Sequence, residues 1–474
     1  MWRHALVVGV FYLATIRAGQ GWGDDFAQYI QHARNIATGV PYAQTGYIYN
    51  PHNPALGPRA YPPGFPVLLA PVVRLFGLDF RAMKVLIVLC FVGVLLLVPQ
   101  VFDRDLPRPY VAALVLLFGL NPFMWEFKDQ VLSDVPFLLF TLLAIYGFQR
   151  QSAALAGFAT YAAIATRVLG IVLVPCFVAH DLMQRRRVGP ATAVGCGIAL
   201  ALAAGQYLLG VRDGSYVNTL VLSAATAGRN VVDYLRALSD IWDDGYTATV
   251  RKAVFLLTIG FTTYGYTRSV RSGLTVIEIF PALYVVPIIL WPAYQGTRLL
   301  IPLIPFYLYY CLQGLRGLEQ RVAARSRTLQ LACIAIVLLV YAARYTTLRF
   351  GPMTEGVATA ESEALFRFVK TSTAAGDVFI FSKPRALALF TGRRAAAPSI
   401  EAEPCGLWRF MRQIGATYVV TGPAAVHDDA TVGSLDQFVA RFPQSLQLVM
   451  RNDEIAAYRV VGDPCRGSGL GLVA

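Results

Sequence analysis

The sequence predicts a mostly α-helical, polytopic membrane protein of about eleven transmembrane helices with a C-terminal extracytoplasmic α/β domain. Of its 474 residues, 56% are hydrophobic and only 15% are charged, and the mean hydropathy is +0.52. Soluble domains contain about 25% charged residues, so this composition excludes both a water-soluble and a disordered chain. The apolar residues are also grouped into long uncharged runs, such as 85–98 and 329–343, as in membrane-spanning helices.

The predicted membrane domain covers residues 1–349, and a soluble domain covers 350–474. A long first outer loop, 20–82, follows the first span. The predicted spans, each uncertain by a few residues at either end, are 4–19, 83–101, 110–125, 134–149, 152–166, 168–183, 190–210, 251–267, 274–291, 299–315 and 328–348.

Arginines in alternate loops predict the orientation of these spans. Arg150, the run 185–187 and the arginines of 316–327 lie in loops of one set, which the positive-inside rule assigns to the cytoplasm. The first outer loop and the soluble domain then face the exterior. These loops also account for the net charge of +13. No nucleic-acid-binding motif is found, so we expect membrane lipids as partners and no nucleic acid.

The first span has an alternative interpretation as a cleaved secretory signal. Arg3 precedes a short apolar stretch, and the small residues Gly19 and Gly21 have the spacing of a cleavage site. A retained anchor is favoured because acidic residues with a predicted function follow within a few positions.

Residues 350–474 alternate predicted helices with short apolar strands, a pattern typical of a small α/β domain. Cys405 and Cys465 form a disulfide if this domain is extracytoplasmic, and two unpaired thiols are the alternative. The Gly-rich segment 467–471 is of low complexity. The predicted elements are a helix at 358–374, a strand at 378–381, a helix at 407–414, and strands at 417–420 and 455–461.

The first outer loop opens with the acid pair Asp24 and Asp25. A helix follows until Gly39, and its apolar stripe predicts that it lies in the membrane interface. Asp25 and Gln28 have the spacing of a capping box, which leaves Asp24 without a structural role. An acid beside the bilayer without such a role is a candidate functional residue. The stripe consists of Phe26, Tyr29, Ile30, Ala33, Ile36 and Ala37.

A second acid, Asp134, stands immediately before the fourth span. An N-cap is the alternative role, since Pro136 follows in the first turn. Asp24 leaves the first span on the outside, and Asp134 enters the fourth span from the outside. The two acids therefore reach the same face of the membrane although they are far apart in the sequence.

Three arginines, Arg59, Arg167 and Arg298, lie beside apolar runs on this outer face. Planar guanidinium groups suit the recognition of phosphate, and contact with lipid headgroups is the alternative for each. Together with the two acids, they predict a site for an anionic, lipid-linked group.

The chain resembles the membrane-embedded glycosyltransferases of the GT-C fold, in the bacterial branch related to protein O-mannosyltransferases and the lipid A aminoarabinose transferase. The resemblance covers roughly residues 20–310, and it depends on the order and sidedness of five loose motifs. These are Asp24-Asp25 with Tyr29 and Ala33, the Pro-rich segment Tyr61–Pro71, Leu132–Pro136, Thr166-Arg167 before Gly170, and Arg298–Pro302 before Pro305.

The resemblance implies a bacterial inner-membrane enzyme that takes a sugar from a polyprenyl-phosphate donor and passes it to a glycan, lipid or protein acceptor outside the membrane, usually with inversion. The family's catalytic acid maps onto Asp24, which would act as general base. Asp134 would orient the acceptor or ligate a divalent cation together with Asp24, and metal use varies in the family. The expected substrate-binding residues are Asp25, His52, Arg59, Tyr61, Arg167 and Arg298.

One departure argues against aminoarabinose as the sugar. That branch has a Glu-Lys pair directly before Pro-Pro, where this chain has Ala60 and Tyr61, and Arg59 is the nearest replacement for the lysine. His52 is expected in a substrate role, with an ordinary loop hydrogen bond as the alternative.

The main rival function is a transporter or flippase of lipid-linked saccharides. Such proteins usually have repeated halves and charges near the middle of the membrane, whereas the acids here lie at one face. A non-catalytic scaffold gives the acid-bearing loop no purpose. An ATP-driven pump is disfavoured because the sequence has no phosphate-binding loop motif.

Overall fold

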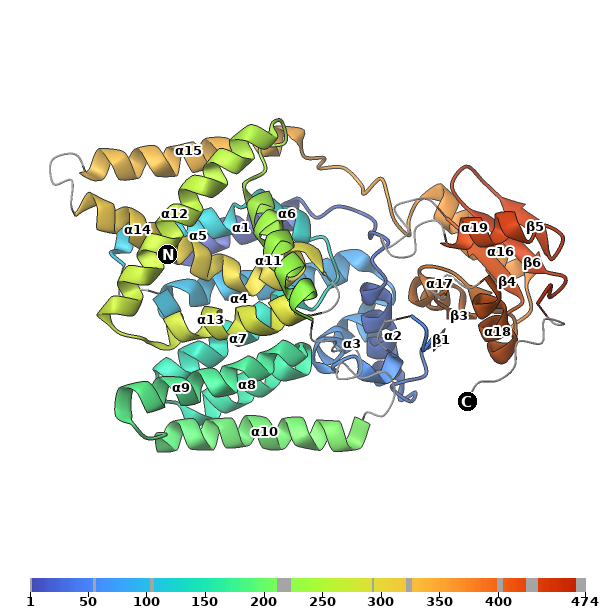
Figure 1. The fold of residues 1–474 in the computed structure, drawn as a ribbon, viewed down its shortest axis with the longest axis horizontal. Helices are drawn as coiled ribbons and strands as arrows, with labels where there is room; N and C mark the ends of the chain where they lie inside the picture. The colour runs from blue at the N-terminus through green and yellow to red at the C-terminus, as the bar shows by residue number, and fades with distance from the viewer. Residues whose placement is uncertain are drawn as a thin grey trace.

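The computed structural model describes residues 2–53, 57–102, 106–210, 223–291, 294–320, 326–398, 404–422 and 434–465. Figure 1 shows the helices of the first three quarters of the chain packed as one bundle, with a small sheet and its helices at one end. Segments of the first outer loop lie between the bundle and the sheet. This arrangement confirms a mostly α-helical chain with a C-terminal α/β part.

Every predicted span coincides with a helix of the bundle. Among the described residues, four helical stretches are long and apolar enough to cross a membrane, and shorter apolar helices accompany them. The helices at the predicted spans are α1 (Trp2–Ala14), α4 (Phe80–Phe102), α5 (Arg108–Gly119), α7 (Asp134–Gln149), α8 (Ala153–Thr166), α9 (Leu173–Arg185), α10 (Pro190–Gly210), α12 (Ala248–Ser272), α13 (Val276–Leu290), α14 (Ile304–Glu319) and α15 (Ser326–Thr347).

Some spans are less regular than predicted. The span at 110–125 is broken at Asn121, whose side-chain oxygen accepts N–H groups from the first turn of the short helix α6 (Pro122–Phe127). Pro122 lacks an N–H and therefore starts a new helix here more easily than it continues the old one. Two other predicted spans begin as 3-10 helices, η2 (Val168–Val172) and η5 (Gly296–Leu303), and a predicted site arginine lies at the start of each.

The helix α1 ends at Ala14, earlier than the predicted end of the first span. A buried charge cluster fixes the segment that follows α1. Asp129 is fully buried and forms ion pairs with Arg17 (Nε–Oδ2 2.7 Å) and Lys128 (Nζ–Oδ2 2.8 Å). Lys84, at the start of α4, donates to two backbone carbonyl oxygens of the same segment. Buried charges are stable only when paired in this way. The cluster therefore holds the chain that leads to Asp24.

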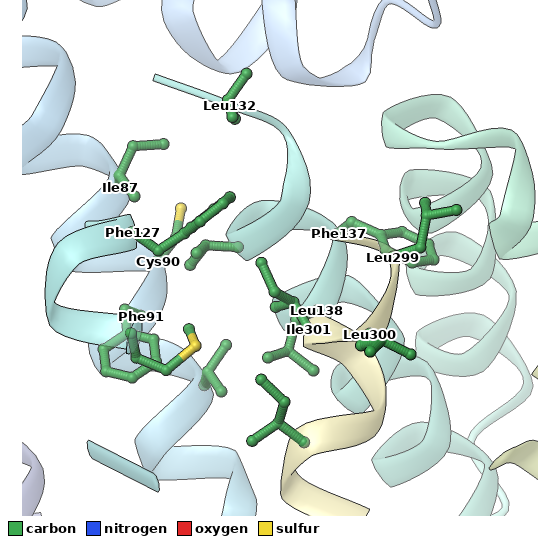
Figure 2. Packing of buried hydrophobic residues seen from close by; sticks show 14 of the residues in the cluster. Ile87, Cys90, Phe91, Phe127, Leu132, Phe137, Leu138, Leu299, Leu300 and Ile301 are labelled. Atoms are coloured by element: carbon green, nitrogen blue, oxygen red, sulfur yellow. The ribbon is translucent and has the colours of Figure 1, made fainter. Parts of the chain in front are cut away.

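The bundle is closely packed around α7, which contacts both α4 and α8. Glycines allow α12 and α14 to approach each other: a Cβ atom on Gly265 or Gly314 would collide with a backbone carbonyl of the facing helix. Apolar side chains fill the core between the helices. Figure 2 shows its apolar side chains from α4, α7 and η5, among them Ile87, Phe91, Phe137, Leu138, Leu299, Leu300 and Ile301.

The first outer loop contains two helices that pack against each other, α2 (Asp25–Thr38) and α3 (Gly64–Phe76). Their packing buries the predicted stripe of α2 as far as Ala33, whereas Ile36 is exposed. Gly39 ends α2, as predicted, and the structure shows that Gly39 has the left-handed conformation. The start of α3 lies against the end of α8, where a Cβ atom on Gly64 would collide with the backbone of Ala165.

The C-terminal part is built on a six-stranded sheet in the order β1-β3-β2-β4-β6-β5. The strands β1, β3, β2 and β4 are parallel, and β6 and β5 add antiparallel pairs. All five elements predicted here are present, and the sequence did not reveal α17, β3, α19 or β5. The elements are α16 (Ala360–Ser372), β2 (Val378–Ile380), α17 (Pro384–Thr391), β3 (Arg394–Ala396), α18 (Pro404–Ile414), β4 (Tyr418–Thr421), α19 (Ser434–Arg441), β5 (Leu446–Arg451) and β6 (Ala456–Val460).

The edge strand β1 (Tyr47–Ile48) belongs to the first outer loop and not to the C-terminal part of the sequence. Two side-chain amides of the same loop extend this contact: Asn50 donates to the carbonyl oxygen of Ala397 (3.0 Å) and Asn53 to that of Pro398 (2.9 Å). The loop and the sheet therefore form one folded unit at one end of the bundle.

The predicted disulfide between Cys405 and Cys465 is present and ties α18 to the end of the described chain. The Gly-rich segment 467–471 lies outside the described residues. The remaining described helices are η1 (Pro58–Ala60), α11 (Ala224–Ser239) and η4 (Asp240–Trp242).

Candidate active site

Three carboxylates meet at the end of the bundle next to the sheet. Asp24 immediately precedes α2, Asp25 is the first residue of α2, and Asp134 is the first residue of α7. The guanidinium group of Arg298 joins two of them, with its Nη1 atom 2.9 Å from Asp25 Oδ2 and its Nη2 atom 3.3 Å from Asp134 Oδ2. Since Asp24 is the neighbour of Asp25, Asp24 and Asp134 lie at the same end of the helix bundle, in agreement with the span count.

The capping roles considered for these acids are wrong. Asp25 lies inside α2 and not at its N-cap, and Asp134 likewise follows Ser133, which occupies the N-cap position of α7. Gln28 is buried and its amide lies 2.8 Å from the ring of His32 and 3.3 Å from Thr45, so it does not complete a capping box. Pairing with arginine replaces capping because hydrogen bonds between ionised groups are roughly twice as strong as neutral ones.

Asp25 is held in its ionised form by three donors. Arg298, the hydroxyl group of Tyr61 (2.6 Å) and Arg385 (3.3 Å) all donate to its carboxylate oxygens. Burial alone would raise the pKa of Asp25, but the two guanidinium groups and the Tyr61 hydrogen bond outweigh it and hold the pKa far below its ordinary value. A carboxylate in such surroundings is a weak base.

Asp24 has the opposite electrostatic environment although it is the adjacent residue. One oxygen accepts the backbone N–H of Ala386 (3.0 Å), and the other lies 3.6 Å from Arg385 Nε. Burial raises the pKa of Asp24 more than Arg385, Lys383 and this N–H lower it, and the result is a pKa of about 6. Asp24 is therefore ionised at neutral pH and still able to accept a proton.

Asp134 is almost completely buried and forms ion pairs with Arg167 and Arg298. Arg167 lies between α8 and η2 in an extended conformation, which turns its side chain away from the helix axis toward Asp134. The Tyr29 hydroxyl is 3.0 Å from that of Ser133, the residue before Asp134. These contacts attach α2, the start of α7 and the end of α8 to one another.

Of the predicted site residues, the structure brings Asp24, Asp25, Tyr61, Asp134, Arg167 and Arg298 together. Arg59 is exposed on η1. His52 is also exposed and donates its backbone N–H to the side chain of Asn50 at the junction with the sheet. Substrate roles for Arg59 and His52 stay predictions.

Arg385 is not among the residues predicted from the sequence, and it contacts both Asp24 and Asp25 from the first turn of α17. Lys383 and Pro384 before it form a recognisable helix start, because proline is favoured in the first turn. That signal locates a helix. It does not reveal that the first turn of this helix, from the C-terminal domain, contacts Asp24 and Asp25.

A divalent cation is not supported by the donor set of the described residues. Those residues contain no group of three or more His, Cys, Asp or Glu side chains that could hold a metal ion. Asp24 and Asp134 each accept from N–H donors instead. A cation held by Asp24 and Asp134 stays a prediction, and no step below depends on it.

Comparison with known proteins gives a match in structure only. No family model and no curated protein sequence matches the chain. Among solved structures, a crystal structure of ArnT from Cupriavidus metallidurans bound to undecaprenyl phosphate is 13% identical, covers 96% of each chain and has a TM-score of 0.59. The apo state of the same ArnT is 12% identical, with the same coverage and a TM-score of 0.56.

The chain has the ArnT fold. This confirms the GT-C fold that the sequence motifs indicated. Because 96% of both chains is covered, the ArnT fold includes the C-terminal sheet as well as the helix bundle. The acids and arginines described above lie at the junction of these two parts of the ArnT fold.

Proposed function

We propose that this chain is an integral-membrane glycosyltransferase that transfers a sugar from a polyprenyl-phosphate donor to an acceptor on the outer face of the bacterial inner membrane. The fold supports this proposal, because the ArnT neighbour was crystallised with undecaprenyl phosphate. If transfer takes place on the outer face, the C-terminal domain, which contacts the acids, lies in the periplasm.

The observation that supports the reaction most strongly is the contrast between Asp24 and Asp25. Asp25 is fully engaged by two arginines and Tyr61, whereas Asp24 has a pKa of about 6. A general base works best when its pKa lies near the operating pH. Asp24 therefore fits the role of base, and Asp25 fits the role of an anchor for Arg298 and Arg385.

Asp24 would take the proton of the acceptor hydroxyl while that oxygen bonds to the anomeric carbon. The bond from this carbon to the phosphate oxygen breaks, and its electron pair stays on the polyprenyl phosphate. A single displacement of this kind inverts the anomeric carbon. The leaving phosphate gains negative charge, which preorganised cations at the site stabilise.

Arg298 and Arg167 are the residues we assign to the leaving phosphate. Both guanidinium groups lie at the outer ends of bundle helices, where the phosphate of a membrane-embedded lipid would lie. Arg298 Nε is buried and has no hydrogen-bond acceptor within the described residues. An unsatisfied buried donor costs about 1–3 kcal/mol, and a phosphate oxygen would relieve this cost.

The residues beside the acids argue against aminoarabinose as the sugar. Ala60 and Tyr61 replace the Glu-Lys pair of the aminoarabinose branch, and Tyr61 donates to Asp25, so we do not propose aminoarabinose. A glycan, a lipid or a protein hydroxyl would each suit a base such as Asp24.

The proposal is tested by a transfer assay with purified protein in detergent. Radiolabelled polyprenyl-phosphate sugars are supplied one at a time with an envelope acceptor fraction, and wild type is compared with Asp24→Asn. Loss of sugar from one donor that requires Asp24 is the expected result. Movement of a lipid-linked sugar across liposomes without turnover of any donor would instead identify a flippase and overturn the proposal.

A further inference from the structure

The first turn of α17 belongs to the C-terminal domain and contacts the acids of the membrane domain directly. The backbone N–H of Ala386 donates to Asp24 Oδ1 at 3.0 Å, and Arg385 Nη1 donates to Asp25 Oδ1 at 3.3 Å. The Arg385 side chain is only 7% exposed. Burial of a guanidinium group at a domain junction is unfavourable unless anions and hydrogen-bond acceptors compensate it.

Two aromatic rings of the first outer loop complete the surroundings of Arg385. Its guanidinium carbon lies 4.8 Å from the ring centre of Tyr47 and 5.0 Å from that of Tyr61. Burial alone would lower the pKa of Arg385, but these phenol groups and the two carboxylates outweigh it and raise the pKa. The arginine is thus permanently charged and enclosed by residues of the outer loop.

The position of α17 over the acids is set by the shared sheet. The loop strand β1 pairs with β3, which directly follows α17, and α17 itself packs on α2. Gly46, beside β1, allows close approach to the helix, since a Cβ atom there would lie 3.1 Å from the Cβ atom of Ala388. Figure 1 shows α17 next to α2 and β1. These contacts therefore hold the first turn of α17 beside Asp24.

We propose that the C-terminal domain is part of the catalytic site and that Arg385, on the first turn of α17, is a positioning residue that orients Asp24 and Asp25 for sugar transfer. This inference rests on the proposed glycosyltransferase function. It assigns to the domain a role that its small α/β fold alone does not suggest.

Two consequences follow from the contacts of Arg385. The Ala386 N–H donates to one oxygen of Asp24, and the Arg385 guanidinium group lies 3.6 Å from the other, so loss of the arginine removes the cation that orients this oxygen and lowers kcat. The charged groups facing Asp24 are Arg385, Lys383 and Asp25. Arg385 is the main cation among them, and its removal raises the pKa of Asp24 further above its ordinary value.

The test compares Arg385→Gln, Arg385→Lys and a matched control, Arg394→Gln. Arg394 lies on β3 of the same domain with an exposed side chain. We expect Arg385→Gln to lower kcat about 10-fold or more at pH 7 and to move the acidic limb of the rate profile upward by at least about half a pH unit. Arg385→Lys retains the charge and should keep the limb at the wild-type pH, and Arg394→Gln should behave as wild type.

A purely structural role for Arg385 would lower the yield of folded protein without moving the acidic limb, and that result overturns the inference. An unchanged kcat and pH profile for Arg385→Gln does the same. If Arg385→Gln does not fold, Lys383→Gln is the second variant, and it should move the limb upward by a smaller amount. Failure of wild type to transfer any sugar refutes the proposed function itself, so the two failures are distinguishable.

Discussion

Neutralising the two adjacent acids should have opposite effects on stability and unequal effects on transfer. Asp24→Asn and Asp25→Asn remove the same charge from neighbouring positions and keep nearly the same shape. In Asp24→Asn the variant loses the proposed base, so kcat should fall about 10²- to 10⁴-fold. The protein should nevertheless be at least as stable as wild type.

The magnitude follows from the pKa of Asp24, which rises from 3.8 to about 6 in the folded protein. A raised pKa means that folding binds the proton more tightly, so the ionised form destabilises the fold at every pH above the unfolded value. Two pKa units correspond to about 3 kcal/mol, which is the upper limit of the gain in Asp24→Asn at pH 7. The partial exposure of the side chain reduces this gain.

The sign is reversed for Asp25, whose pKa is lowered by Arg298 and Arg385 once burial is outweighed. Its ionised form stabilises the fold above the unfolded pKa, and this contribution is lost as the pH falls through the folded pKa. Asp25→Asn leaves both arginines with one partner fewer. Its side chain is 29% exposed, so we expect a loss of about 1–3 kcal/mol rather than the full value for a buried pair.

The assay is thermal unfolding of both variants in one detergent at pH 7, with transfer measured on the same samples. The expected pattern is an inactive Asp24→Asn of equal or higher stability beside a less stable Asp25→Asn. Equal destabilisation by the two variants would refute the electrostatic reasoning. Transfer by Asp24→Asn at the wild-type rate would refute its role as base.

Four other predictions follow from the site. In the pH–rate profile of wild type, kcat/KM should rise toward a plateau as Asp24 ionises near pH 6, and a profile without an acidic limb between pH 5 and 7 would contradict this. Arg298→Gln should raise KM for the donor and lower kcat together, since its guanidinium group faces both Asp25 and Asp134; an unchanged KM would remove it from phosphate binding. The N–H donors at Asp24 and Asp134 favour transfer without the cation predicted from the sequence, so transfer should survive EDTA, and loss restored by a divalent cation would instead support that cation. Cys405→Ser should destabilise the C-terminal domain by about 2–4 kcal/mol, measured as a lower unfolding temperature that reductant does not lower further.

The sequence predicted those features of the fold that depend on local composition. Long apolar runs located the spans. An apolar stripe with a period of 3.6 residues located α2, because a helix that buries one face needs apolar residues at that period. Counting spans also placed Asp24 and Asp134 on one face, and the contact of Arg298 with both Asp25, the neighbour of Asp24, and Asp134 brings them to one end of the bundle. The number of spans between two residues decides whether they lie on the same face, even where the predicted helix ends are wrong.

Contacts between distant segments could not be predicted in this way. Asp25 and Gln28 have the spacing of a capping box, yet long-range pairs with Arg298 and Arg385 determine where the Asp25 carboxylate lies. The approach of Arg385 depends on the pairing of β1, a strand of two residues, with β3, a strand of three. Strands this short leave too little periodic pattern to be recognised, and their register is set by tertiary packing.

The most direct test of the central claim is phosphorus NMR of a polyprenyl-phosphate sugar incubated with the protein and an acceptor. The account predicts that the phosphodiester signal of the donor is replaced by the monoester signal of polyprenyl phosphate, that this requires the acceptor, and that Asp24→Asn prevents it. A phosphodiester signal that persists with every donor, while the same protein moves the lipid across a membrane, would contradict it.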